Sequence, residues 1–534
     1  MHLLHRDKLL SLESGYYMDL KLMKQSNFIY WASGIVSICG IVFEVLFGAI
    51  GSYILGDGVK QYTLTISLFL TGMGIGASLS EKVTGNLVLS FIYIEYLVAL
   101  IGGFSSLTMF SLTAFGANGM DALFLYTITL VIGALTGVEL PILIRKANEI
   151  GVTLERSTAR VLFSDYAGGL IGGLLFVYFL RPQLGMIQSA FFVGCINLSV
   201  ALVILFLFRK EIKRVKAHTI IGSFIALLLF LGLLFGQPLT SKLEQKMYSD
   251  PIIYMEESSY QKIVLTRQGE DVRFYLDGGL QFSSIDEHRY HEVLVHPVMS
   301  ITDKSNVLVL GGGDGLAIRE ILKYDDVQQI TVVDLDPAVV DLASEHPFLQ
   351  ALNKQAFNEE KVTVVHDDAF EFLESDLTLY DVIIVDLPDP NNESINKLYT
   401  KEFYSLVRNH LQPWGAVMVQ ATSPVFAVEV YWTIHHTIQS TGLHTIPLHV
   451  DVPSFGNWGF VLASRKEIEV ADLFIDEKID TKFITDDLLI SLTTFGKDED
   501  AIIIDRNGKE KELEVNTLIN PVLLPIYEKS WKYY

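Results

Sequence analysis

The sequence of 534 residues predicts an α-helical polytopic membrane domain, then a small β-sheet subdomain, then an α/β Rossmann-like domain. Three observations support this fold class. Long apolar runs are confined to residues 1–240, and short runs with period-two alternation occupy residues 251–285. Over residues 286–465, strand-like runs alternate with helical periods, which indicates a mostly parallel sheet covered by helices. Residues 466–534 are expected to form a C-terminal extension that packs on this third domain.

The first domain contains about seven apolar segments. Each segment is close to the length that crosses a bilayer core as a helix. The segments are residues 29–51, 64–80, 87–110, 122–144, 161–180, 187–208 and 218–236. The second and fifth segments also carry glycines at small-xxx-small spacing, which favours close helix packing. These glycines are Gly72, Gly74 and Gly76, and Gly168, Gly169, Gly172 and Gly173.

Four acidic residues interrupt the apolar segments: Glu44, Glu95, Glu139 and Asp165. Ionisable groups at membrane depth are costly and usually face a bundle interior or a wet cavity. A path for cations is one interpretation. Polar contacts between helices, or positions close to the membrane interface, are the other, and the sequence assigns no basic partner that would separate them.

Residues 306–336 are the centre of the third domain. A run rich in Val and Leu predicts a buried strand, a glycine-rich turn follows, and residues 316–324 continue at helical period before a second strand. Asp334 ends that second strand, where a carboxylate can hold ribose hydroxyls. Asp314 lies within the turn and would repel a pyrophosphate, so the turn favours a cationic ligand, such as a sulfonium nucleoside, over a dinucleotide.

Carboxylates follow the ends of four successive predicted strands. They are Asp314, Asp334, Asp368 and Asp386. A single Asp after a strand is usually a helix cap or a turn former. Ligands of parallel sheets, however, bind beyond the carboxyl ends of the strands, so we expect the four side chains to converge on one crevice. Their like charges would raise one another's pKa unless a cation is bound there.

The net charge of the protein limits the kinds of ligand that it is expected to bind. With 40 Lys and Arg against 62 Asp and Glu, the formal charge is −22, which argues against nucleic acid as a ligand because phosphate binding needs a basic face. The two cysteines, Cys39 and Cys195, lie in apolar runs and predict packing rather than a disulfide or a metal cluster.

Several motifs resemble the spermidine synthase (polyamine aminopropyltransferase) family. They are GGGDGLAIRE from Gly311, DGGLQFSSIDEHRYHE at 277–292, DLPDP at 386–390, and the pair Tyr260 and Gln261. The resemblance covers residues 252–465 and implies a Rossmann-like fold of the class I methyltransferase type. The membrane half resembles the bacterial subfamily in which this enzyme is fused to a multi-spanning domain.

The resemblance implies a reaction. The aminopropyl group of decarboxylated S-adenosylmethionine, a co-substrate, would pass to a diamine, expected to be putrescine, giving spermidine and methylthioadenosine. Neither a metal nor another cofactor is implied. A homodimer is implied by the resemblance alone.

The resemblance also assigns the amine side of the site. Asp386, the first Asp of the DxxDP motif, matches the base that takes a proton from the attacking amine. Asp389 and Asp314 match the groups that hold the positive ends of the diamine and of the aminopropyl group. Tyr290 and His291 match residues that line the diamine side.

On the nucleoside side, Asp334 matches the acidic residue that binds ribose. Asp368 and Ala369 match the pair at the adenine, and Gln261 matches the glutamine that reaches the nucleoside. Gly311 and Gly313 belong to the loop that the nucleoside approaches.

The sequence departs from the family's usual motifs at two places that are expected to contact the substrates. Asn391, Asn392 and Glu393 stand where family members commonly have a Gly-Pro-Ala loop, and Val452 stands where many have Tyr before Pro-Ser-Gly. Two alternative functions stay open at this point. One is an S-adenosylmethionine-dependent methyltransferase on the same fold, and the other is a polyamine or cation transporter with a nucleoside-sensing domain.

The side of the membrane that carries the third domain follows from two conflicting arguments. Basic residues cluster before residue 29, at 145–160 and at 209–216, so these three regions are expected in the cytoplasm. If the last apolar segment then spans the cell membrane, the third domain lies outside. The donor nucleoside is made in the cytosol, however, so we expect a cytoplasmic catalytic domain and a last segment that does not cross.

Overall fold

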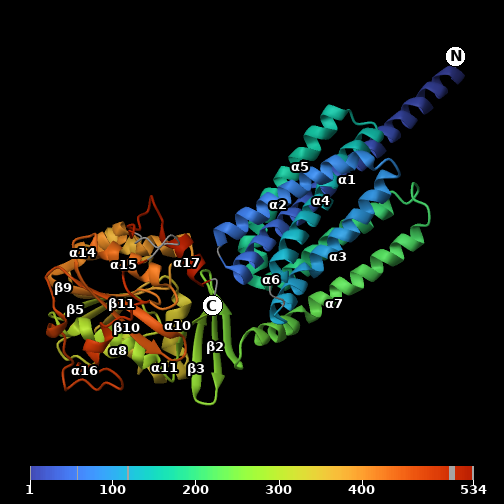
Figure 1. Cartoon of the computed structure of the whole chain (residues 1–534). Helices are drawn as coiled ribbons and strands as arrows, with labels where there is room; N and C mark the ends of the chain where they lie inside the picture. The colour runs from blue at the N-terminus through green and yellow to red at the C-terminus, as the bar shows by residue number, and fades with distance from the viewer. Residues whose placement is uncertain (1, 57, 117–118, 504–511, 532–534) are drawn as a thin grey trace. The chain divides into compact units, whose positions relative to one another are not determined.

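The computed structural model describes residues 2–56, 58–116, 119–503 and 512–531. The chain divides into two compact units, residues 1–249 and 250–534. Figure 1 shows the first as a set of long helices and the second as sheets covered by helices. Each unit matches the predicted class of structure, so the predicted fold class is confirmed.

The first unit is entirely helical in its regular structure among the described residues. Its α-helices are α1 (His2–Leu55), α2 (Gly58–Leu79), α3 (Leu87–Ala114), α4 (Met120–Glu149), α5 (Leu154–Leu175), α6 (Arg181–Leu207) and α7 (Val215–Met247). A short 3-10 turn, Ser80–Lys82, follows α2, and a π-helical stretch, Phe176–Leu180, joins α5 to α6. The side chains of residues 2–25, including the predicted first basic cluster, are outside the described part.

Six helical runs in the described part of this unit are long and apolar enough to cross a membrane. The count differs from the predicted seven because two predicted segments, 161–180 and 187–208, belong to one helical run, Leu154–Leu207. Gly185 in this run has φ 67° and ψ −175°, which are not helical angles, so the run bends there. Gly172, before the bend, packs on Ile38 of α1, and Val193, after it, contacts Cys39. The chain therefore reverses between α5 and α6.

Glycines set the closest helix contacts. A Cβ added at Gly76 would lie 1.9 Å from the Ala134 carbonyl oxygen of α4, and one at Gly168 would lie 2.2 Å from the Gly34 carbonyl oxygen of α1. Gly72 and Gly172 make similar backbone contacts. Close packing was thus predicted correctly for these four glycines. The prediction was wrong for Gly74 and Gly173, which have no neighbour within 4 Å at the Cβ position because they lie on other faces of their helices.

The residues that follow the last predicted apolar segment are mostly helical. Helix α7 continues to Met247, although Pro238 lies inside it. The polar residues at 237–247 therefore extend the last helix instead of ending it.

The second unit begins with a four-stranded antiparallel sheet in the order β1-β2-β3-β4. Its strands are β1 (Ile252–Glu257), β2 (Lys262–Gln268), β3 (Asp271–Leu276) and β4 (Gly279–Ser283). One face is apolar because alternate residues such as Ile263, Leu265 and Phe274 point the same way, and it packs on Leu316 and Leu342 of the larger fold.

The larger sheet has seven strands in the order β10-β11-β9-β8-β5-β6-β7. Strands β9, β8, β5, β6 and β7 are parallel, and β10 and β11 form an antiparallel hairpin at one edge. The strands are β5 (Asn306–Gly311), β6 (Gln329–Val333), β7 (Val362–Val365), β8 (Tyr380–Asp386), β9 (Leu411–Gln420), β10 (His444–Val452) and β11 (Gly456–Ser464).

Helices cover both faces of this sheet. They are α8 (Glu287–Ser300), α9 (Leu316–Ile321), α10 (Pro337–Glu345), α11 (Pro347–Asn353), α12 (Ala369–Ser375), α13 (Glu393–Asn396), α14 (Lys401–His410), α15 (Val428–Gln439), α16 (Asp486–Leu492) and α17 (Leu523–Trp531). Val307 and Val309 belong to one apolar core and Leu308 and Leu310 to the other, as the period of a strand requires. Both cores also contain residues from the range 466–534, including those of α16 and α17.

Candidate functional site

Four carboxylates lie at one edge of the parallel sheet. Asp386 ends β8, Asp314 follows β5, Asp334 follows β6 and Asp368 follows β7. These strands are adjacent in the order β8-β5-β6-β7 and run in the same direction. Their carboxyl ends therefore share one edge, as the sequence predicts, and the four acidic residues stand side by side along it.

The glycine-rich loop fits closely between these acidic residues. A Cβ added at Gly311 would lie 2.1 Å from the Asp386 carbonyl oxygen, and one at Gly313 would lie 2.5 Å from Asp334 Oδ2. Gly311 also has φ 83°, which favours glycine. A larger residue at Gly311 would therefore displace the backbone at the end of β8, and one at Gly313 would displace the Asp334 carboxylate.

Asp386 is held by a tyrosine. The Tyr290 hydroxyl, on α8, donates to Asp386 Oδ1 over 2.6 Å. Burial raises the pKa of Asp386, while nearby His291 and the Tyr290 hydrogen bond oppose that rise. One carboxylate oxygen is thus fixed by Tyr290, and a raised pKa makes the carboxylate a better proton acceptor.

His291 lies behind the carboxylates in a buried ion-pair network. Its Nδ1 is 2.9 Å from Glu287 Oε2, and Arg319 donates to both oxygens of Glu287. Burial favours the neutral ring, but the hydrogen bond and charge of Glu287 outweigh it and raise the pKa of His291 to about 9. His291 is therefore a cation at neutral pH, and its charge opposes the rise in pKa at Asp314 and Asp386.

Asp314 is the carboxylate of the glycine-rich turn. Its Oδ1 accepts from the Leu316 backbone N–H over 2.8 Å at the start of α9. Burial raises its pKa to about 6, with His291 opposing and Asp386 adding to the rise. Ionised Asp314 is thus more costly than an exposed Asp, and a bound cation would relieve that cost.

Asp389 is surrounded by donors that the sequence analysis missed. Thr422 Oγ1 donates over 2.7 Å, the Tyr527 hydroxyl over 3.0 Å and Gln420 Nε2 over 3.2 Å. Gln420 and Thr422 stand at the end of β9, next to β8, so the strand-end rule could have identified them. No local signal identifies Tyr527, because α17 reaches Asp389 across 138 residues of chain.

Asp334 holds the glycine-rich loop in place from the end of the neighbouring strand β6. Its Oδ2 accepts from the Gly313 backbone N–H over 3.0 Å, and its Oδ1 from the Asp336 N–H over 3.0 Å. Burial raises its pKa, and these two backbone hydrogen bonds oppose the rise. Asp334 thus joins the ends of β5 and β6 around the position where a nucleoside would lie against the loop.

Asp368 and Ala369 start helix α12. Asp368 Oδ1 caps the helix by accepting from the Phe370 N–H over 2.9 Å, and Oδ2 accepts from Lys397 Nζ over 2.6 Å. Ala369 is buried against the sheet. Lys397 is a further residue that the sequence analysis missed.

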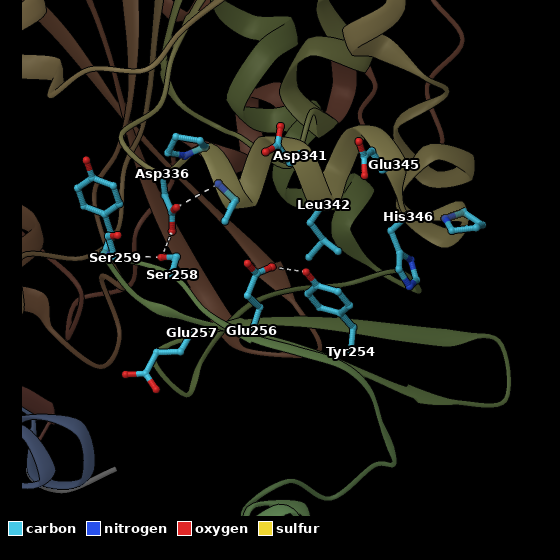
Figure 2. A pocket seen from close by; sticks show the side chains of 14 residues that line it. Tyr254, Glu256, Glu257, Ser258, Ser259, Asp336, Asp341, Leu342, Glu345 and His346 are labelled. Carbon is cyan, nitrogen blue, oxygen red and sulfur yellow. Dashed lines mark hydrogen bonds between the residues drawn. The ribbon is translucent and has the colours of Figure 1, made fainter. Parts of the chain in front are cut away.

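Gln261 is bonded to Asp336, a residue that lines a cavity. Its Nε2 donates to Asp336 Oδ2 over 3.0 Å, and Ser258 donates to the same oxygen over 2.6 Å. Asp336 also lines a cavity of about 880 Å³ between β1 and α10. Figure 2 shows carboxylates along this cavity on both sides, from Glu256 and Glu257 of β1 to Asp341 and Glu345 of α10. None of the predicted site residues is among those that line it.

The arrangement is chemically specific. Asp314, Asp386 and Asp389 are partly buried acceptors without a described Lys or Arg bonded to them, and the nearby cations His291 and Arg319 both pair with Glu287. A ligand with separated positive charges would match these carboxylates, and a glycine-rich loop beside Asp334 provides a surface for a nucleoside.

Comparisons with known proteins agree with this chemistry. Residues 287–473 match the spermine/spermidine synthase domain. The chain is 66% identical to the polyamine aminopropyltransferase of Oceanobacillus iheyensis over 515 residues, covering 96% of this chain and 99% of that protein. It is 39% identical to the polyamine aminopropyltransferase of Leptospira interrogans, covering 94% and 98% of the two chains. A crystal structure of spermidine synthase in complex with the transition-state analogue AdoDATO aligns with 46% of this chain and 86% of that one, at 25% identity and a TM-score of 0.43.

Proposed function

The chain belongs to the polyamine aminopropyltransferase family, and on this premise we propose that it transfers the aminopropyl group of decarboxylated S-adenosylmethionine to a diamine. The observation that carries the proposal is the row of partly buried carboxylates beside the glycine-rich loop. Asp386 and Asp389 belong to one short motif, yet each has its own set of hydroxyl or amide donors. Such a row suits an amine and opposes the carboxylate of S-adenosylmethionine, which disfavours the methyltransferase alternative.

Asp386 is the proposed base. An alkylammonium has a pKa of about 10, so the attacking nitrogen must lose a proton before it is nucleophilic. Asp386 accepts that proton, a C–N bond forms to the propyl carbon, and the C–S bond breaks with its electron pair moving to sulfur. Methylthioadenosine and the longer polyamine are the products. Tyr290 orients Asp386 through its 2.6 Å hydrogen bond.

The remaining amine-side residues bind and orient. We assign Asp389 to the far ammonium of the diamine and Asp314 to the aminopropyl end. Since the sulfonium carbon is already activated, alignment of the two reactants is the main task of the protein. His291 contributes from the diamine side as a cation whose charge opposes the rise in pKa of Asp314 and Asp386 and so favours their ionised forms.

The nucleoside is assigned to the other half of the row of strand-end carboxylates. Asp334 would accept from the ribose hydroxyls, and Asp368 with Ala369 would meet the adenine. Gly311 and Gly313 let the nucleoside approach the backbone closely. Gln261 stands nearby, just before β2, with its amide turned to Asp336.

Putrescine is the diamine that we propose. The test is a turnover assay of the full chain in detergent with decarboxylated S-adenosylmethionine and a panel of diamines that differ in length. Formation of methylthioadenosine with putrescine as the preferred acceptor is expected. A longer preferred amine would refute the putrescine assignment alone, and no methylthioadenosine with any amine would refute the transferase, leaving the transporter with a nucleoside-sensing domain.

We also propose that the first unit spans the cell membrane, with the catalytic domain in the cytoplasm and a homodimer as the assembly. Large apolar side chains are exposed on its helices, as lipid contact would require. Among them are Phe163 (75% exposed), Tyr166 (74%) and Ile220 (69%). Five of the six apolar runs have the length of one membrane span, and Leu154–Leu207, which reverses near Gly185, has the length of two.

A further inference from the structure

Two carboxyls in the helical unit are buried without a partner. Glu95 of α3 is 0% exposed and Glu139 of α4 is 2% exposed. No other described residue donates a hydrogen bond to their four carboxyl oxygens. The two side chains are electrostatic neighbours of each other. A buried polar group is costly when nothing satisfies it, and two neighbouring acidic groups are costlier still.

An unpartnered amide faces the same place. Asn197 of α6 is 1% exposed, and neither its nitrogen nor its oxygen has a described partner. A Cβ added at Gly194 would lie 2.8 Å from the Ala99 carbonyl oxygen, and one at Gly103 would lie 3.8 Å from that of Ala190. Helices α3 and α6 are therefore antiparallel with Ala99 beside Gly194. One turn further along, this register sets Asn197 beside Glu95.

The other groups around the pair come from the remaining packed helices. Cys39 of α1 lies close enough to both carboxyls to interact with them electrostatically, and Asp165 of α5 interacts with Glu139 in the same way. From α7, His218 bonds Tyr93 and not the pair. The described residues contain no ion pair to either carboxyl and no group of three His, Cys, Asp or Glu side chains arranged to hold a metal ion.

We propose that Glu95, Glu139 and Asn197 form a binding site for a protonated primary amine, distinct from the strand-end crevice. An ammonium group has three N–H donors, and the two carboxyls and the amide oxygen supply three acceptors. Within the helical unit the pair has no cation from the described residues, so a proton shared between the carboxyls reduces its charge from −2 to −1. Amine binding releases that proton to solvent, and the site exchanges one cation for another.

The proposed ligand is a diamine or polyamine, because the proposed reaction consumes the first and produces the second. This choice of ligand therefore rests on the proposed function. The existence of the site does not rest on the proposed function, because Glu95, Glu139 and Asn197 all belong to the first, helical unit. A diamine or polyamine bound here would be held within the helical unit, as a storage, sensing or transport step requires.

The test is equilibrium dialysis of the full chain in detergent with radiolabelled spermidine and no nucleoside. The double variant Glu95→Gln/Glu139→Gln preserves side-chain shape and removes both charges. We expect it to lose one equivalent of bound spermidine while its turnover stays within about twofold of the parent. Glu155→Gln removes an exposed carboxyl of α5 and serves as the control, with no change in stoichiometry.

Two further measurements test whether the lost spermidine was bound at this site. Calorimetry in two buffers of different ionisation enthalpy should show about one proton released per amine bound at this site by the parent and none by the double variant. The single variant Glu95→Gln should weaken the binding about tenfold, as loss of a charged acceptor does. Unchanged spermidine stoichiometry in the double variant, or binding without proton release, would overturn the proposal. Absence of turnover in the parent would instead count against the proposed function.

Discussion

Asp386 accepts a hydrogen bond from the Tyr290 hydroxyl at one of its carboxylate oxygens. Replacing it in Asp386→Asn removes the proton acceptor and keeps the shape. Turnover should fall by about 10² to 10⁴, the range for loss of a general base, while methylthioadenosine binds with nearly unchanged affinity. Rates and calorimetric affinities would be compared with Asp326→Asn, an exposed carboxylate of the same unit. Near-parental turnover of Asp386→Asn would remove Asp386 from this role.

The pH dependence of turnover depends on Asp314. Its pKa is raised to about 6, so it is ionised above that pH and protonated below it in the free enzyme. Because only the ionised form holds a cation, kcat/KM should fall roughly tenfold per pH unit below about 6. Bound amine favours the ionised form, so the acid limb of kcat should lie at lower pH. A kcat/KM that is flat from about pH 7 to about pH 5 would contradict the role of Asp314.

At the scale of elements, helix α17 carries Tyr527 to Asp389. Tyr527→Phe removes one of three donors to that carboxylate, so the KM for the diamine should change by about threefold to tenfold. The KM for decarboxylated S-adenosylmethionine should stay the same. Tyr404→Phe is a matched control, because the buried Tyr404 hydroxyl has no hydrogen-bond partner among the described residues. Equal effects of both variants would show that Tyr527 acts only through packing.

The α2 and α4 pair provides a prediction about stability. A Cβ at Gly76 would meet the α4 backbone, whereas one at Gly74 would meet open space. Gly76→Ala should therefore lower the free energy of unfolding by about 1–3 kcal/mol through overpacking. Gly74→Ala should leave it unchanged or raise it, since Ala is the better helix former. Thermal unfolding of both variants in detergent measures the difference, and similar melting temperatures would show that this helix contact is wrong.

At the scale of the whole molecule, the side of the membrane on which the catalytic domain lies can be tested directly. Lys242 is exposed near the end of α7, before the second unit begins. In intact cells, Lys242→Cys should be modified by a membrane-impermeant thiol reagent only after permeabilisation. The parent protein is the control, since its Cys39 is buried and Cys195 half-buried. Modification of intact cells would place the domain outside, as the charge of the loops alone predicts.

The order of the structural classes, the parallel sheet and its row of strand-end carboxylates are all predictable from the sequence. These features depend on local periodicity and on one rule for parallel sheets, so the alignment of Asp314, Asp334, Asp368 and Asp386 along one edge is predictable from the strand ends alone. The sequence also identified the glycines of α2 and α5 as contact positions. Spacing along a single helix did not show which of those glycines meets a neighbour.

The surroundings of each carboxylate, in contrast, depend on contacts between distant parts of the chain. Thr422 and Tyr527 reach Asp389 from distant parts of the chain, and Gln261 turns to Asp336. The reversal at Gly185 likewise depends on one residue with non-helical angles inside an otherwise apolar run, which composition does not reveal. Long-range contacts of this kind arise from packing between elements, and the pattern within any one element carries no record of them.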